Sequence, residues 1–176
     1  WNSDVCSSDL HGILKYYTDT DVAIVAAFRD SNTDSENDIQ TNKLKSEIRS
    51  MGYGFSVLTG HFPDKVKRTV LLVNSGKLNQ QKKNDFLQDM KKVASHYDQD
   101  SIIYSPHDSH DAFVVGLTNV DENGRRSWPG NGRMISIGPL STKIRWKDDQ
   151  SFMVESADVQ KSFFGSWSEF LRKKSE

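Results

Sequence analysis

The sequence predicts a single α+β domain, with a mixed and mostly antiparallel sheet packed by three to four helices. Its 176 residues suit one domain. Short apolar runs of strand length alternate with helical patterns in the first half of the chain. Several strands then follow one another through short connections in the second half, which is typical of α+β folds. No internal repeat divides the chain further.

The first ten residues, WNSDVCSSDL, are treated separately because they resemble a translated sequencing-adapter fragment in environmental DNA. They lack the apolar core and cleavage signature of a secretory signal. We therefore expect a non-native segment over 1–10 and the single domain over 11–176, the alternative being a native polar arm. The only cysteine is Cys6, so the rest of the chain has no disulfide framework and no cysteine chemistry.

The charges are nearly balanced, with 23 basic and 24 acidic residues and a net charge of −1. Proteins that coat nucleic acid usually carry a strong basic excess, so we expect no stable nucleic-acid binding. No apolar run approaches the roughly 18 residues that a membrane span needs. The sequence thus predicts a soluble protein without a membrane association.

The first half of the chain predicts alternating helices and strands. The run VAIVAAF (22–28) has the length and composition of a strand that is buried on both faces. Potential N-caps over 31–36 and Gly52 as a C′ residue delimit a helix with Ile39, Leu44, Ile48 and Met51 on one stripe. In order, we expect a helix over 10–17, a strand over 22–28, this helix to about Met51, a strand over 53–58, a turn over 60–64 and a strand over 66–73.

The second half predicts one well-defined helix followed by several strands. Apolar residues from Leu78 to Tyr97 recur at helical spacing, with lysines and acids on the other side. A glycine-rich connection over 121–132 separates the middle strands from the last ones. We expect strands over 101–104, 112–117 and 133–137, a final ribbon over 143–146 and 151–154, and an amphipathic helix from Val159 to Leu171.

Two stretches of the chain carry a recognisable pattern. In the first, a buried strand ends in an aromatic–arginine pair and is followed by an asparagine-bearing helix, a Gly-Tyr-Gly strand and a glycine turn. The second is Tyr-Asp-Gln-Asp-Ser at 97–101. The residues that carry the pattern are Phe28, Arg29, Asn37, Leu44, Gly52, Tyr53, Gly54 and Gly60, together with the second stretch.

Over these stretches, about half of the chain, the sequence resembles an uncharacterised family of small proteins found in phage and bacterial genomes. The resemblance implies a phage protein that acts in the host cytoplasm, and it implies no particular activity. The chain departs from the pattern at Lys67-Arg68-Thr69-Val70, where acidic residues are expected before the strand.

The segment His107-Asp108-Ser109-His110-Asp111 holds the candidate catalytic residues, His107 and His110. Two imidazoles beside carboxylates can act as general acid and base on a phosphodiester, or bind a ligand. The alternative is a solvated polar turn. No second histidine pair or HExxH motif supports a metal site, so we predict no bound metal and no cofactor.

The candidate ligand-binding residues are cationic, aromatic or amide side chains. Arg29 follows a buried strand, where a guanidinium can grip a phosphate or carboxylate, or instead pair with a helix acid. The glycine-rich connection offers an indole platform and arginines for a nucleotide, or is an ordinary hairpin with an Asn-Gly turn. The full set is Arg29, Tyr53, His61, Tyr104, Trp128, Asn131 and Arg133.

Three functions follow from these residues. The first is a phage accessory protein that binds a nucleotide-derived or other anionic small ligand and sequesters a host immune signal. The second is a histidine-dependent phosphodiesterase that acts on such a nucleotide. The third is an inhibitor that docks on a host protein. The small-ligand functions require Arg29, His107 and Arg133 to meet at one rim.

Overall fold

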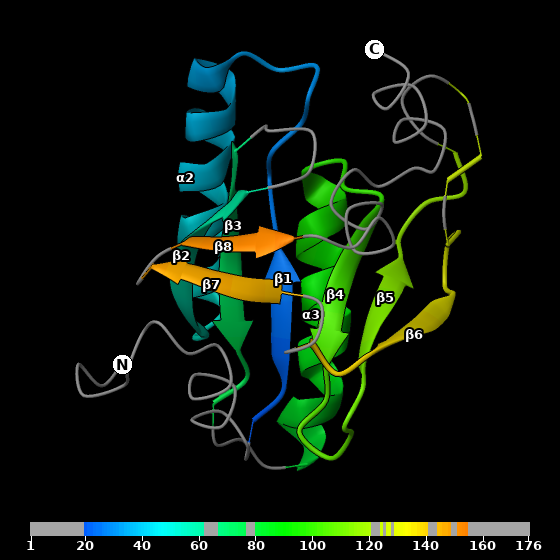
Figure 1. Cartoon of the computed structure of the whole chain (residues 1–176). Coiled ribbons are helices and arrows are strands. Elements are labelled where there is room, and N and C mark those ends of the chain that lie inside the picture. Colours follow the sequence, from blue (N-terminus) through cyan, green and yellow to red (C-terminus); the bar gives the residue numbers. More distant parts are fainter. Residues whose placement is uncertain are drawn as a thin grey trace.

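The computed structural model describes residues 20–61, 67–76, 80–120, 124, 126–127, 129–140, 144–148 and 151–154. Its strands form one eight-stranded sheet in the order β6-β5-β4-β1-β3-β2-β8-β7 (Figure 1). All neighbouring strands in this sheet are antiparallel except β2 and β8. The predicted mixed, mostly antiparallel sheet is therefore confirmed. The strands are β1 (Val22–Val25), β2 (Gly54–His61), β3 (Lys67–Asn74), β4 (Ser101–Ser105), β5 (Ala112–Gly116), β6 (Met134–Gly138), β7 (Ile144–Asp148) and β8 (Ser151–Val154).

Two helices lie within the described residues, α2 (Asp34–Ser50) and α3 (Gln80–His96). This is fewer than the three to four expected. The other two predicted helices, over 10–17 and 159–171, fall outside the described residues. Neither α2 nor α3 is long and apolar enough to cross a membrane.

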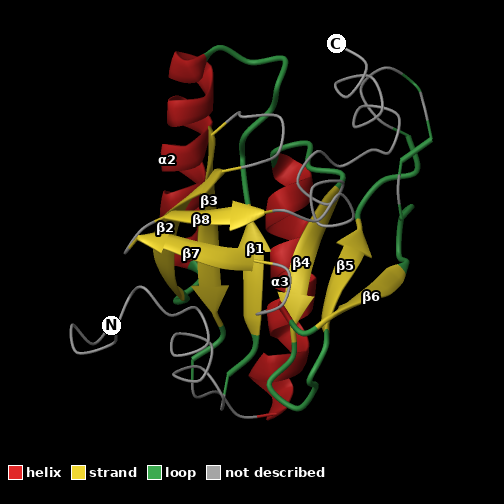
Figure 2. Cartoon of the chain, viewed as in Figure 1, coloured by secondary structure: helices red, strands yellow, loops and turns green. Residues whose placement is uncertain are grey.

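The sheet is buried on both faces. On one face, side chains of β1, β3 and β4 pack against Leu44 and Ile48 of α2 and against Phe86 and Met90 of α3. On the other face, Phe152 of β8 packs among side chains of β1, β2 and β3 because the sheet curls over itself. Figure 2 shows the two helices on one side of the sheet and the β7–β8 ribbon crossing the other side. Strands with apolar residues on both faces follow from this arrangement.

Helix α2 begins and ends where the sequence predicts. Thr33 is its N-cap and forms a capping box with Glu36. Gly52, with φ +86°, follows the C-cap Met51. The predicted apolar stripe needs a correction, because Ile39 is 51% exposed. The buried positions are Asn37, Thr41, Leu44 and Ile48, which share one face at the helical period, and Ile39 lies outside that face.

The β2–β3 hairpin is longer than predicted. We expected a turn to begin at Gly60, but Gly60 pairs with Arg68 and His61 pairs with Lys67. His61 is thus the last residue of a strand and not part of a turn. Next to β2 in the sheet, the β7–β8 ribbon forms as predicted.

The strand directions define two ends of the sheet. The last residues of β1 and β5 lie at the same end of the sheet as the first residues of β3 and β4. We call this the Arg29 end. At the opposite end, β1 begins beside the last residues of β3 and β4; we call this the Asp21 end. Residues that follow β1 and residues that follow β4 therefore lie at opposite ends.

Candidate functional site

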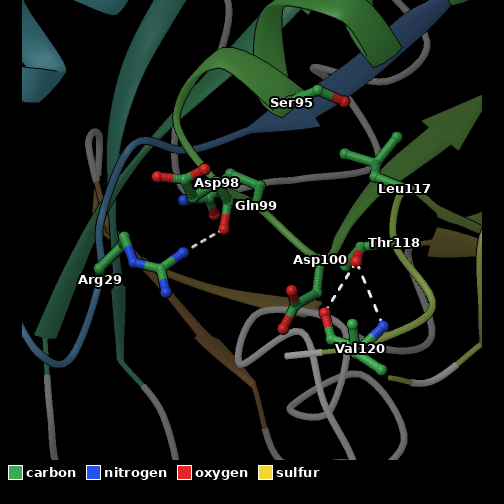
Figure 3. Close-up of a pocket in the computed structure, with 8 residues that line it drawn as sticks. All are labelled: Arg29, Ser95, Asp98, Gln99, Asp100, Leu117, Thr118 and Val120. Carbon is green, nitrogen blue, oxygen red and sulfur yellow. Dashed lines mark hydrogen bonds between the residues drawn. The ribbon is translucent and has the colours of Figure 1, made fainter. Parts of the chain in front are cut away.

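A pocket of about 320 Å³ opens at the Arg29 end of the sheet (Figure 3). Three segments form its walls: the residue run after β1, the turn between α3 and β4, and the residues after β5. This volume is at the lower end of the range for small-molecule sites. The lining residues are Arg29, Ser95, Asp98, Gln99, Asp100, Leu117, Thr118 and Val120.

The backbone of Arg29 is fixed by a buried amide. The Arg29 N–H donates to Asn37 Oδ1 at 2.9 Å, and Asn37 Nδ2 donates back to the Arg29 carbonyl at 3.1 Å. Asn37 is 6% exposed on the buried face of α2. The Arg29 guanidinium then reaches across the pocket and donates to the Asp98 carbonyl (Figure 3). The chain thus holds this cation at the pocket wall.

The opposite wall is the turn that ends α3. Asp98 has φ +54°, a left-handed conformation that few residues other than glycine adopt. The Gln99 N–H donates to the Ala94 carbonyl, and Gln99 Nε2 donates to the Phe28 carbonyl at 3.1 Å. These bonds join the turn to the segment that carries Arg29. Strained conformations of this kind concentrate at functional sites.

The third wall depends on a glycine. The Leu117 N–H donates to the Asp100 carbonyl at 2.8 Å, and Thr118 Oγ1 donates to the Val120 carbonyl. Just before them, a Cβ at Gly116 would lie 1.8 Å from the Gly130 carbonyl oxygen. Only glycine therefore allows this backbone to approach so closely.

We expect Gly116→Ala to destabilise the protein by about 3 kcal/mol, because its methyl group must displace backbone rather than a mobile side chain. For a chain of this size, that lowers the Tm by roughly 6–12 °C. Gly54→Ala is the matched control, since its nearest atom is the side-chain Asn74 Nδ2 at 3.2 Å. Equal melting temperatures for the two variants would contradict the close approach.

The pocket combines both signs of charge. Arg29 provides a guanidinium, and Asp98 and Asp100 provide carboxylates from the facing turn. A ligand that fits this pattern carries an anionic group and a cationic group within one small molecule. Of the predicted binding residues that the structure describes, Arg29 alone lines this pocket.

A second polar cluster lies at the Asp21 end of the sheet. Asp21, 3% exposed, accepts hydrogen bonds from Tyr104 Oη at 2.8 Å and from the His107 backbone N–H at 3.0 Å. His107 Nδ1 lies 2.8 Å from Asp21 Oδ1. Burial alone would raise the pKa of Asp21, but the bonds from His107 and Tyr104 hold it below its ordinary value. Burial and the Asp21 carboxylate together raise the pKa of Tyr104.

The common rim expected from the sequence does not form. Arg29 follows β1 and Arg133 precedes β6, at the Arg29 end, whereas Tyr104 and His107 lie at the Asp21 end. The reason is that β4 runs antiparallel to β1. The expectation that Arg29, His107 and Arg133 meet was therefore wrong.

The other predicted residues are dispersed. Tyr53 donates to Asp89 Oδ2 at 2.6 Å and packs edge-on against Phe86, so it joins the start of β2 to α3. Asn131 and Arg133 are exposed and flank Gly132, in the predicted Asn-Gly turn. His110 is exposed in the β4–β5 connection, and Trp128 lies outside the described residues.

Sequence reasoning missed three acidic residues. Asp98 and Asp100 entered the analysis only as part of the Tyr-Asp-Gln-Asp-Ser stretch, and Asp21 was not selected. Asp21 and Asp100 directly precede buried strands and Asp98 lies three residues before one, and a position next to a buried strand is the signal that selected Arg29.

Comparison with known protein families shows which family the chain belongs to. A family model described as the S-adenosylmethionine lyase family matches residues 23–168. The chain belongs to the S-adenosylmethionine lyase family. The matched span includes the whole pocket, as well as Tyr104 and His107, and Asp21 precedes it. No curated protein matches the chain. A member of this family processes or binds a small molecule, as the sequence predicted in general terms.

Proposed function

We propose that this protein binds S-adenosylmethionine in the Arg29 pocket and cleaves it. At neutral pH this molecule carries a carboxylate, an ammonium group and a positively charged sulfur on one adenosine. The observation that carries the proposal is a pocket that one arginine and two aspartates line together, in a chain of this family. Arg29 receives the substrate carboxylate, and Asp98 and Asp100 attract the cationic part.

The chemistry of the substrate limits what a lyase can do. When a carbon–sulfur bond of the sulfonium breaks without water, its electron pair moves to sulfur and a neutral thioether leaves. In one route, the substrate's own carboxylate oxygen forms a new bond to this carbon, which closes a lactone. In the other route, a proton leaves the neighbouring carbon and its electron pair forms the double bond of an alkene. In both routes the protein's part is to bind and orient the substrate and to exclude water.

The decisive experiment is to incubate the purified protein with S-adenosylmethionine in H₂¹⁸O and identify the products by mass spectrometry. We expect a thioether that retains the adenosine, and a second product that has gained no ¹⁸O during the cleavage step; early time points exclude later hydrolysis of a lactone. Absence of both turnover and binding at millimolar substrate would contradict the proposal.

The two pocket carboxylates provide a further prediction. Asp98→Asn and Asp100→Asn should each weaken S-adenosylmethionine binding about three- to tenfold, because each removes a negative charge near a cation. Asparagine tolerates the left-handed conformation of Asp98, so the backbone is kept. Isothermal titration should show a smaller loss of affinity for S-adenosylhomocysteine, whose sulfur is neutral. The control is Asp38→Asn on the exposed face of α2. Equal losses for both ligands would contradict recognition of the sulfonium, because both ligands carry the ammonium group.

Sequestration of a nucleotide-derived host signal by a phage protein stays a second proposal. S-adenosylmethionine is itself an adenosine derivative, so the same pocket would serve either function. Product formation separates the two, because a sequestering protein releases its ligand unchanged.

The phosphodiesterase alternative has one observation in its favour. The buried Asp21 carboxylate orients the His107 imidazole, as a general base requires. If the protein cleaves a cyclic dinucleotide, His107→Ala should abolish that activity and leave S-adenosylmethionine turnover unchanged. The opposite pattern, loss of S-adenosylmethionine turnover in His107→Ala with the fold intact, would move the lyase site to the Asp21 end.

A further inference from the structure

A buried arginine contacts the chain on both sides of Arg29. Arg68, the second residue of β3, is 2% exposed. Its Nη2 lies 3.2 Å from Asp30 Oδ1, and its guanidinium carbon lies 5.2 Å from the centre of the Phe28 ring. Arg68 therefore contacts the residue before Arg29 and the residue after it.

Because Arg68 is buried, these contacts stabilise a charge that has lost its hydration. A guanidinium that loses its hydration needs an anionic or aromatic partner to compensate for it. Both of these contacts are made to the segment Phe28–Asp30, so moving this segment away from β3 would break the ion pair and the ring contact together. A planar guanidinium can stack on a ring and pair with a carboxylate at once, which a lysine does less well.

Two further contacts hold the same segment. Asn37 binds the backbone N–H and carbonyl of Arg29, and Gln99 Nε2 binds the Phe28 carbonyl. The segment is thus fixed from β3, from α2 and from the α3–β4 turn. The Arg29 side chain leaves this fixed segment toward the Asp98 carbonyl in the pocket (Figure 3).

We propose that Arg68 is a positioning residue for carboxylate recognition: through Phe28 and Asp30 it sets the backbone from which Arg29 reaches the substrate carboxylate. The inference rests on the proposed function and extends it to a residue that does not line the pocket. It also assigns a role to the basic residue at the place where the sequence departs from its resemblance.

The test compares S-adenosylmethionine with its decarboxylated analogue, which keeps the sulfonium and lacks the carboxylate. Isothermal titration on the full chain, well below the Tm, gives the ratio of the two dissociation constants. We expect the wild type to prefer S-adenosylmethionine at least tenfold. Arg29→Ala should remove this preference. Arg68→Met should lower it at least fivefold, and Arg68→Lys should lie between Arg68→Met and the wild type.

The matched control is Arg49→Met. Arg49 makes a similar contact, 5.0 Å from the Phe55 ring centre, but neither residue lines the pocket. This variant should keep the full preference for the carboxylate. If Arg68→Met does not fold, Phe28→Leu and Asp30→Asn take its place, because each removes one of the two contacts.

The outcomes separate the two claims. In one outcome, Arg29→Ala loses the preference for the carboxylate, whereas the folded Arg68 variants (or Phe28→Leu and Asp30→Asn) change only the Tm. Arg68 is then merely structural, and the inference is wrong. If the wild type binds neither compound, the proposed function fails and the inference falls with it.

Discussion

Replacing Arg29 with alanine should raise the KM for S-adenosylmethionine by about 100-fold. The guanidinium is held at the pocket wall by its bond to the Asp98 carbonyl, and its backbone is fixed by Asn37. Hydrogen bonds to charged groups contribute roughly 1.5–3 kcal/mol, and each 1.4 kcal/mol changes affinity about tenfold. Steady-state kinetics with the purified variant gives the KM directly.

The control for this prediction is Arg133→Ala. Arg133 is an exposed arginine at the same end of the sheet, but it does not line the pocket. The Arg133→Ala variant should keep the KM for S-adenosylmethionine within about twofold of wild type, because one exposed side chain attracts a charged ligand only weakly. If the two variants raise the KM equally, the carboxylate is not received specifically by Arg29.

Local signals predicted the elements and the β7–β8 ribbon, but not the strand pairings between distant parts of the chain. The capping box at Thr33 and the glycine at position 52 delimit α2 because they act within a few residues of the chain. The parallel pairing of β8 with β2 joins residues about 90 positions apart. Nothing in either strand's own pattern specifies that partner, since both are short and largely apolar.

Arg29 was predicted because a cation directly after a buried strand is easy to recognise. Its expected companions were wrong because strand direction cannot be read from strand composition. Once β4 pairs antiparallel with β1, the loop with His107 must lie at the end opposite Arg29. The same pairing brings Asp100, which precedes β4, to the Arg29 pocket.

Asn37 shows how polar residues mislead a helical pattern. The apolar stripe of α2 was drawn through Ile39, yet the buried position is Asn37. An amide in a helix interior is usually exposed. Here its two hydrogen bonds to the Arg29 backbone compensate for its burial. The deviation from the simple pattern therefore coincides with the candidate site.

A large loss of stability should come from Asp21→Asn. This carboxylate is buried and joins the start of β1 to Tyr104 and to the loop at His107. An amide cannot accept all of these hydrogen bonds, and its NH₂ group must face a donor. We expect a loss of about 2–4 kcal/mol, or roughly 5–15 °C in the Tm. Asp108→Asn, an exposed carboxylate in the same loop, is the control and should change the Tm little.

The stability that Asp21 contributes should also depend on pH in a defined direction. Its pKa in the folded protein lies below the ordinary value of 3.8, which the unfolded chain retains. The unfolded state therefore takes up the proton first as the pH falls. The contribution is complete above about pH 4 and is lost as the pH falls through the folded pKa. Melting curves between pH 7 and pH 2.5 should show a constant gap between wild type and Asp21→Asn above pH 5, and a shrinking gap below pH 4. A gap that widens on acidification would mean that burial outweighs the hydrogen bonds, and that Asp21 is held in its neutral form.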